Sequence, residues 1–393
     1  MTHETLHNEI AKLLYVEDRG LYDIMIASII ANSLQLGDPV WMTLIGASSA
    51  GKSQLIRPLA MSEDGPVHRI DDLTANTMIS GSLGLENSLL GRIGDFGILS
   101  MDDLTVLFSK NAEERQAVLS QFRMIYDGRM SKSSGNKKDD MVWQGYMGMI
   151  AGSTPSIYRY FNEVADMGER FISYRMKNFD KDKALDFIDQ NPYKSKELDE
   201  KLCAVFDEFI KGAVAGKTDD LLELDGEVVD EIKKVASHCT HLRTPLHMDE
   251  RTGLVDEFPE PEMPMRVMKQ LRPLAIGLQV VRGEKLTPAT MEPVLWVAYS
   301  LANDKRRAYL RTAVGLEYYG KEITSRSVSA VTGLHSDIVK RGMDQLQVLG
   351  IIELKDEDAH GQKKWRLKHR GLQQIVMRLD TPAESIEMIN DTW

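Results

Sequence analysis

The segment from Gly46 to Ser53 has the composition and spacing of a phosphate-binding loop. It reads GASSAGKS and matches G-x-x-x-x-G-K-[ST] at every fixed position. Glycines let such a loop curl so that backbone N–H groups face phosphate oxygens, and the following helix adds its positive end. We expect Lys52 to reach the β- and γ-phosphates of ATP and the Ser53 hydroxyl to ligate Mg²⁺. The predicted nucleotide-binding residues are Gly46, Ala47, Ser48, Ser49, Ala50, Gly51, Lys52 and Ser53.

Two acids, Asp102 and Asp103, follow a second apolar run. A phosphate loop of this kind needs a carboxylate at the end of a neighbouring strand to hold Mg²⁺. We assign Asp102 to Mg²⁺ and Asp103 to orienting the attacking water, and this pair predicts ATP hydrolysis. A strand that ends in a solvated acidic turn would show the same two residues.

Four short apolar runs predict the strands that position these residues. The runs are continuous rather than alternating, which is typical of strands buried on both faces of a parallel sheet. Helical patterns lie between them, notably over 111–126, so the sequence predicts a layered α/β domain. The four runs are VWMTLIG (40–46), FGILSM (96–101), YMGMIAG (146–152) and FISYRM (171–176).

The remaining patterns divide the chain into four parts. We expect a helical N-terminal segment over 1–36, an α/β core over 37–176, a helical region over 177–316 and a small domain over 317–393. The small domain reads as a winged helix-turn-helix, with helices over 324–333 and 336–349 and wing strands over 351–355 and 364–368. Such a domain presents basic side chains to duplex DNA, although the same fold also docks proteins. The candidate DNA contacts here are Lys340, Arg341, Lys363 and Lys364.

Composition bounds the class of protein. The 393 residues carry a net charge of −11, yet 305–378 hold 15 Lys and Arg against 8 Asp and Glu. An acidic body with a basic C-terminal end favours a nucleic acid contact at that end. No apolar stretch reaches the length of about 18 residues that a membrane span needs. The two cysteines supply neither a disulfide framework nor a zinc site by themselves, so we expect a cytoplasmic protein.

Six motifs in order resemble the AAA+ ATPases of the pre-sensor-1 β-hairpin group. The closest likeness is to the minichromosome-maintenance-like helicases of phages, satellites and other mobile elements. The resemblance runs from about Asp38 to Arg311 and implies an AAA+ core with a helical lid, assembled as a hexameric ring. Its motifs are DPVWMTLIGASSAGKS, IGDFGILSMDDLTVL, FRMIYDGRMSKSSG, WQGYMGMIAGSTP, MGERFISYR and PEPEMPMRVMKQL.

The resemblance also implies three roles beyond the phosphate loop. Thr154 falls at the sensor-1 position, where asparagine is commoner in the family. Arg170 matches the arginine finger that such proteins present to the ATP of a neighbouring subunit, where it would stabilise charge on the γ-phosphate. Arg266 matches the sensor-2 arginine. Each arginine also has a nearby carboxylate with which it could pair instead, at Glu169 and Glu262.

An insertion over 129–145 lies where the family carries hairpins that point into the ring pore. Lys132, Lys137 and Lys138 flank a glycine–asparagine turn, which suits phosphate contacts with single-stranded DNA. A solvated loop is the alternative, because Asp139 and Asp140 offset part of the charge.

These observations predict an ATP-driven motor that translocates on or unwinds DNA during replication of a phage or mobile element. Single-stranded DNA would occupy the pore, and duplex DNA the winged helix. The alternative is a non-helicase ATP switch: a helicase loader, a transposition regulator or a defence ATPase that docks through its winged helix. About 36 residues precede the ATPase, where cellular relatives have a large DNA-binding collar, and this difference keeps the alternative open.

Overall fold

A computed structural model describes residues 1–74, 76–80, 84–133, 140–160, 170–249, 251, 255–256, 258–359 and 361–379. The chain divides into two compact units. The first comprises Met1–Ile157, Glu169–Val228 and Lys269–Val294. The second comprises Tyr158–Gly168, Val229–Met268 and Leu295–Trp393. The helical region expected over 177–316 is therefore shared between the two units.

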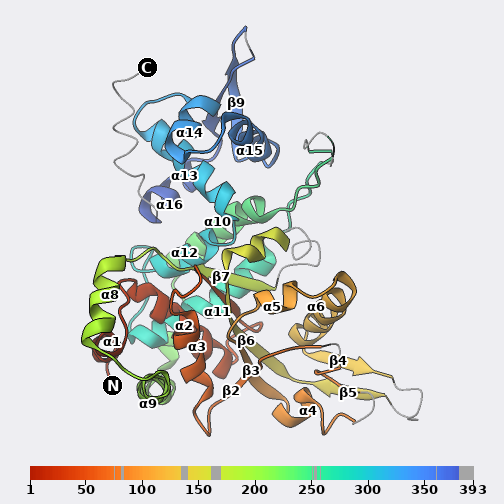
Figure 1. The fold of residues 1–393 in the computed structure, drawn as a ribbon, viewed down its shortest axis with the longest axis vertical. Coiled ribbons are helices and arrows are strands. Elements are labelled where there is room, and N and C mark those ends of the chain that lie inside the picture. The colour runs from red at the N-terminus through yellow and green to blue at the C-terminus, as the bar shows by residue number, and fades with distance from the viewer. Residues whose placement is uncertain are drawn as a thin grey trace. The chain divides into compact units, whose positions relative to one another are not determined.

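The first unit is built on a five-stranded parallel sheet (Figure 1). Its order is β2-β3-β6-β1-β7, so β6 lies between β1 and β3. All five residues of β1 are buried, as expected for a strand covered on both faces. The four predicted strands are confirmed, and β2 is a fifth that the apolar pattern did not indicate. The bounds are β1 Trp41–Ile45, β2 Val67–Arg69, β3 Phe96–Met101, β6 Tyr146–Ser153 and β7 Phe171–Arg175.

Helices pack against this sheet and continue its core. The rings of Phe122 and Tyr126 on α6 lie edge-on to Trp41 of β1, with centroids 5.3 and 5.4 Å away. The N-terminal segment is helical, as predicted, but it forms two helices joined by residues 14–18, and the second packs on β1, β3 and β6. The helices are α1 His3–Leu13, α2 Arg19–Ser33, α3 Lys52–Ile56, α4 Leu89–Ile93, α5 Thr105–Phe108, α6 Ala112–Tyr126, α8 Lys181–Gln190 and α9 Ser195–Ala215.

A two-stranded antiparallel ribbon lies between α6 and β6 in the sequence (Figure 1). It pairs β4, Arg129–Lys132, with β5, Met141–Gln144. Met130 and Trp143 face each other across the ribbon and are buried, and the Trp143 Nε1–H donates to the carbonyl oxygen of Gly94 at 2.6 Å. The insertion predicted over 129–145 therefore forms a hairpin with one buried face.

The second unit ends in a small mixed domain. Helices α14 and α15 are joined by a three-residue turn and followed by the β9–β10 hairpin, and β10 also pairs with β8. Thr324 and Ser327 form a capping box at the start of α14, and Gly333 ends it in the left-handed conformation. The bounds are α10 Gly226–Arg243, α11 Met265–Arg282, α12 Glu292–Tyr299, α13 Asp304–Tyr318, β8 Ile323–Thr324, α14 Ser325–Thr332, α15 Ser336–Val348, β9 Ile352–Glu357, β10 Lys363–Leu367 and α16 Arg370–Leu379.

Candidate functional site

The phosphate loop, Gly46–Ser53, joins the carboxyl end of β1 to α3, which begins at Lys52. This is the strand–loop–helix arrangement that the motif requires. Gly51 caps α3 with φ at +83°, in a region that a side chain would strain. The Gly46 N–H donates to the carbonyl oxygen of Ser153 at 3.1 Å, which ties the start of the loop to β6.

The Lys52 side chain lies within the curl of this loop. The residue is 8% exposed, and its Nζ donates to the carbonyl oxygens of Gly46 at 2.9 Å and Ala47 at 2.7 Å. Burial lowers the pKa of the Lys52 ammonium, while the charge of Asp103 raises it and that of Arg175 lowers it further. The loop therefore holds a positive charge beneath its exposed residues, which is where phosphate oxygens would bind.

Asp103 lies at the carboxyl end of β3, close enough for its charge to act on Lys52. Its Oδ1 accepts a hydrogen bond from the Thr105 backbone N–H at 2.8 Å, which fixes the turn after the strand. The structure thus brings the second predicted acid to the lysine of the phosphate loop.

Asp102 is held by two arginines that the sequence did not indicate. Its Oδ2 accepts from Arg57 Nε at 2.7 Å and from Arg69 Nη2 at 3.2 Å. Its backbone packs closely on β6, because a Cβ at Gly152 would lie 2.4 Å from the Asp102 carbonyl oxygen. Arg57 follows α3 and Arg69 ends β2, so neither shares a motif with the acid.

The surroundings of the other carboxylate oxygen of Asp102, Oδ1, show whether the site suits Mg²⁺. Asp102 Oδ1 is buried and has no hydrogen-bond partner within the described part of the chain. A carboxylate oxygen and a hydroxyl such as that of Ser53 are the hard oxygen donors that Mg²⁺ prefers. The residues present therefore fit the predicted ion.

Several hydroxyl groups lie close together where β6 and β3 end. The Thr154 Oγ1 lies 2.6 Å from Ser156 Oγ and 3.4 Å from Thr105 Oγ1, and the latter lies 3.2 Å from Ser153 Oγ. Because β6 lies between β1 and β3, these groups lie between the strand of the phosphate loop and the strand of the acids. Thr154 therefore directly follows the strand that lies between β1 and β3, and its predicted sensor role stays a prediction.

Arg170 lies at the amino end of the strands, opposite the carboxyl end where the phosphate loop lies. It precedes Phe171, which pairs with Trp41 at the amino end of β1, whereas Arg175 pairs with Ile45 at the carboxyl end. The Arg170 side chain is 12% exposed, contacts Asp127 Oδ2 at 3.1 Å and lies over the Tyr126 ring at 5.6 Å. Its observed carboxylate partner is thus Asp127.

Nothing in the sequence indicated a role for Arg175, which lies within a predicted strand and is the last residue of β7. Its charge acts on Lys52, so it lies beside the phosphate loop of its own chain.

Arg266, in the second unit, contacts Glu262 Oε1 at 3.2 Å, the local pairing named as its alternative. Glu262 also accepts from the buried Arg243.

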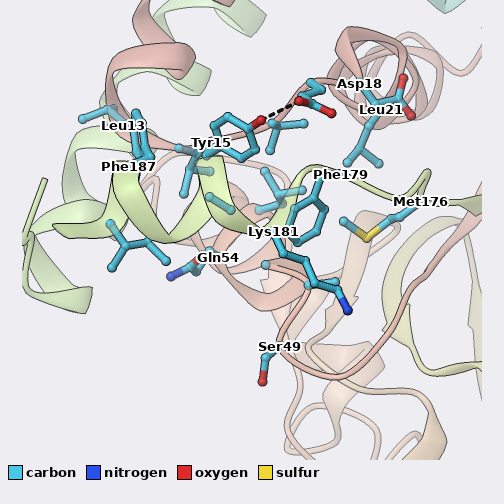
Figure 2. A pocket seen from close by; sticks show the side chains of 18 of the residues that line it. Leu13, Tyr15, Asp18, Leu21, Ser49, Gln54, Met176, Phe179, Lys181 and Phe187 are labelled. Carbon is cyan, nitrogen blue, oxygen red and sulfur yellow. Dashed lines mark hydrogen bonds between the residues drawn. The ribbon is translucent and has the colours of Figure 1, made fainter. Parts of the chain in front are cut away.

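A cavity of about 780 Å³ adjoins the phosphate loop (Figure 2). Its walls come from Ser49–Gly51, from the α1–α2 connection, from the segment after β7 and from α8. The Tyr15 ring lies 6.4 Å from that of Phe179 and 6.1 Å from that of Phe187, which makes one wall aromatic. Apolar, partly aromatic cavities of this size are typical of small-molecule sites. Nothing in the sequence indicated this one, because its walls lie far apart along the chain.

The predicted DNA contacts fall into four groups. Lys340 and Arg341 are exposed on α15. Lys363 and Lys364 pair with Asp344 at 2.8 Å and Glu322 at 2.7 Å, which offsets their charge. Lys132 Nζ donates to Asn76 Oδ1 and to the Ile79 carbonyl oxygen. Lys137 and Lys138 lie outside the described residues.

A scan against models of known protein families found no match, and a search of curated proteins found none either. Within the described residues, no helix is both long enough and apolar enough to cross a bilayer. Function is therefore inferred from the chemistry of the site.

Proposed function

We propose that this protein is an ATP hydrolase of the AAA+ type that works as a motor on DNA. The observation that carries the proposal is that Lys52 and Asp103 both lie at the carboxyl ends of the parallel strands, where the charge of Asp103 acts on Lys52. Ligands of open α/β sheets bind at those ends, and a lysine in a phosphate loop beside a strand-end acid suits triphosphate hydrolysis.

The residues of the site divide the work of hydrolysis. Lys52 would neutralise the β- and γ-phosphates, and Asp103 would orient a water for attack on the γ-phosphorus. Ser53 and Asp102 would hold Mg²⁺, whose charge offsets that of the phosphates when the ion is bound. Arg57 and Arg69 would fix Asp102 so that Oδ1 is the oxygen left for the ion. Thr154 would contact the γ-phosphate through its hydroxyl.

The aromatic cavity supports a nucleoside triphosphate over a simple phosphate. Ser49, Ala50 and Gly51 belong to the phosphate loop and also line the cavity. A base attached to phosphates bound in the loop would therefore enter the cavity directly. Stacking on Tyr15 or Phe179 would use the planar face of the base.

The Asp103→Asn variant should bind ATP but hydrolyse it at least on the order of 10²-fold more slowly than the unmodified chain. The asparagine Oδ1 can still accept from the Thr105 N–H, so the local turn is retained while the charge is lost. ATP binding followed by fluorescence, together with phosphate release, would measure the two effects separately. Turnover at the rate of the unmodified chain would show that Asp103 is not the residue that orients water.

The DNA role rests on two features. The β4–β5 hairpin is inserted before β6, where a ring-forming ATPase would present it to a DNA strand in the central pore. The arrangement of α14 and α15 with β8, β9 and β10 suits a winged helix that binds duplex DNA. The test is displacement of a strand from a forked duplex by the full chain with ATP and Mg²⁺. ATP-dependent displacement supports the motor, whereas DNA-independent hydrolysis without displacement favours the alternative.

One observation favours that alternative, a non-helicase ATP switch docked to a protein partner. Ile338 and Val348 are 47% and 44% exposed on α15, and with Arg341 and Gln345 they share one face by their spacing. Lys363 and Lys364 have their charges offset by local acids. Two exposed apolar side chains on one helix face suit a protein surface better than DNA.

Replacing Lys340 and Arg341 together by alanine separates these two uses of α15. If the helix contacts phosphates, duplex affinity should fall for every sequence, and the slope of log affinity against log salt should drop by about 2. Fluorescence anisotropy across a salt series measures both quantities, with the exposed Lys305→Ala as the matched control. An unchanged affinity and slope would assign α15 to protein docking.

A further inference from the structure

Two histidines and an aspartate meet at the junction of α1 and α2, outside the phosphate site. His3 and His7 lie one turn apart on α1, so their side chains share one face. The Nε2 atoms of both rings lie 2.8 Å from Asp23 Oδ1 on α2, and 3.1 Å from each other. The three atoms thus form a nearly equilateral triangle.

Hydrogen bonds alone do not satisfy this triangle. If both Nε2 atoms carry protons to donate to Asp23, the two donors face each other at 3.1 Å. If one ring lacks that proton, its nitrogen lone pair faces a carboxylate oxygen at 2.8 Å. A cation bound by three lone pairs satisfies all three atoms at once.

The surroundings prepare Asp23 to act as a ligand. Arg282 donates from Nε at 3.0 Å and Nη2 at 2.9 Å to Asp23 Oδ2, which leaves Oδ1 to the histidines. Outer groups that orient a ligating carboxylate in this way are typical of metal sites.

We propose that His3, His7 and Asp23 bind a divalent transition-metal ion, with zinc the preferred ion. Imidazole nitrogens with one carboxylate suit zinc, whereas Mg²⁺ prefers oxygen ligands alone. Tetrahedral bonds of 2.0–2.1 Å place ligand atoms about 3.3 Å apart, close to the separations observed. The side chains of His7 and Asp23 are 2% exposed and that of His3 is 27%, so water can reach the remaining coordination position from the His3 side.

The ion would tie α1 to α2. The residues that join these helices, 14–18, line the cavity beside the phosphate loop, so the metal would hold one wall of that cavity in place. This inference does not depend on the proposed ATP hydrolysis, because it rests on a separate set of side chains.

The test is metal binding by the full chain, freed of any affinity tag and dialysed against a chelator. Titration with Zn²⁺ against a chromophoric zinc indicator should give one ion per chain, and Co²⁺ should give visible d–d absorption typical of nitrogen and oxygen ligands. His7→Gln keeps a side chain that can donate to Asp23 but is a poor zinc ligand. It should weaken zinc binding by more than the roughly 10–100-fold that loss of an outer partner costs.

His335→Gln, on an exposed side chain of the second unit, is the matched control and should bind Zn²⁺ like the unmodified chain. If His7→Gln fails to fold, His3→Gln tests the same ligand set at a partly exposed position. Failure of the unmodified chain to bind Zn²⁺ at micromolar concentration would overturn the proposal. Equal affinity in the His3 or His7 variant, or displacement of Zn²⁺ by equimolar Mg²⁺, would also overturn it.

Discussion

Lys52→Ala should abolish ATP hydrolysis while the chain stays folded. The Lys52 ammonium is the positive charge at the centre of the phosphate loop, where it donates to the carbonyl oxygens of Gly46 and Ala47. No other described residue of the loop carries a positive side-chain charge, so no group within the loop replaces it toward the γ-phosphate. We expect phosphate release to fall by on the order of 10²–10³-fold, the usual effect of losing one preorganised donor to developing charge.

The control for this variant is Lys196→Ala, which removes an 88% exposed lysine from the start of α9. Both variants should keep the circular dichroism of the unmodified chain, because neither lysine belongs to the apolar core. If Lys52→Ala retains more than about a tenth of the original turnover, Lys52 is not the residue that neutralises the phosphates.

The sheet could be predicted from the sequence because its strands are continuous apolar runs. β3 begins and ends where FGILSM does, and β1, β6 and β7 match their runs to within one residue at each end. β2 could not be predicted, because Val67–Arg69 has one buried residue and is a strand only through its pairing with β3. The break between α1 and α2 was also missed, since no proline or glycine occupies 14–18.

The phosphate loop could be predicted because all its residues are adjacent in the chain. The groups around it could not, because tertiary packing alone brings them there. Arg57 and Arg69 reach Asp102 from 45 and 33 residues away. Arg175 comes to Lys52 through the pairing of β7 with β1.

Pairing also changes what a basic residue can do. Lys363 and Lys364 count as two positive charges in the sequence, but Asp344 and Glu322 lie beside them in the fold. The pattern that placed Lys340 and Arg341 on an exposed helix held, because helical spacing is local. A count of charges along a segment therefore overstates the positive electrostatic potential that a binding partner would experience.

Arg170→Ala should bind ATP nearly as well as the unmodified chain and hydrolyse it on the order of 10³-fold more slowly, if Arg170 is an arginine finger. In its own chain Arg170 lies at the amino ends of the parallel strands, whereas the phosphate loop lies at their carboxyl ends. It could therefore act only on the nucleotide of a neighbouring subunit. Asp127→Ala is the control, because it removes the local partner of Arg170 and leaves the guanidinium in place. Loss of hydrolysis in Asp127→Ala equal to that in Arg170→Ala would assign the arginine to that local pair.

Mixing Arg170→Ala with Lys52→Ala tests the same assignment across subunits. A mixed assembly can place an intact phosphate loop from one protomer beside an intact Arg170 from the next, whereas each pure assembly lacks a complete site. Hydrolysis by the mixture should therefore exceed the sum of the two separate activities, with co-assembly checked by light scattering and cross-linking. An arginine that acts only within its own chain gives no such gain, because every chain in the mixture still lacks either Lys52 or Arg170. Activity equal to the sum, in a mixture shown to co-assemble, would exclude a role for Arg170 between subunits.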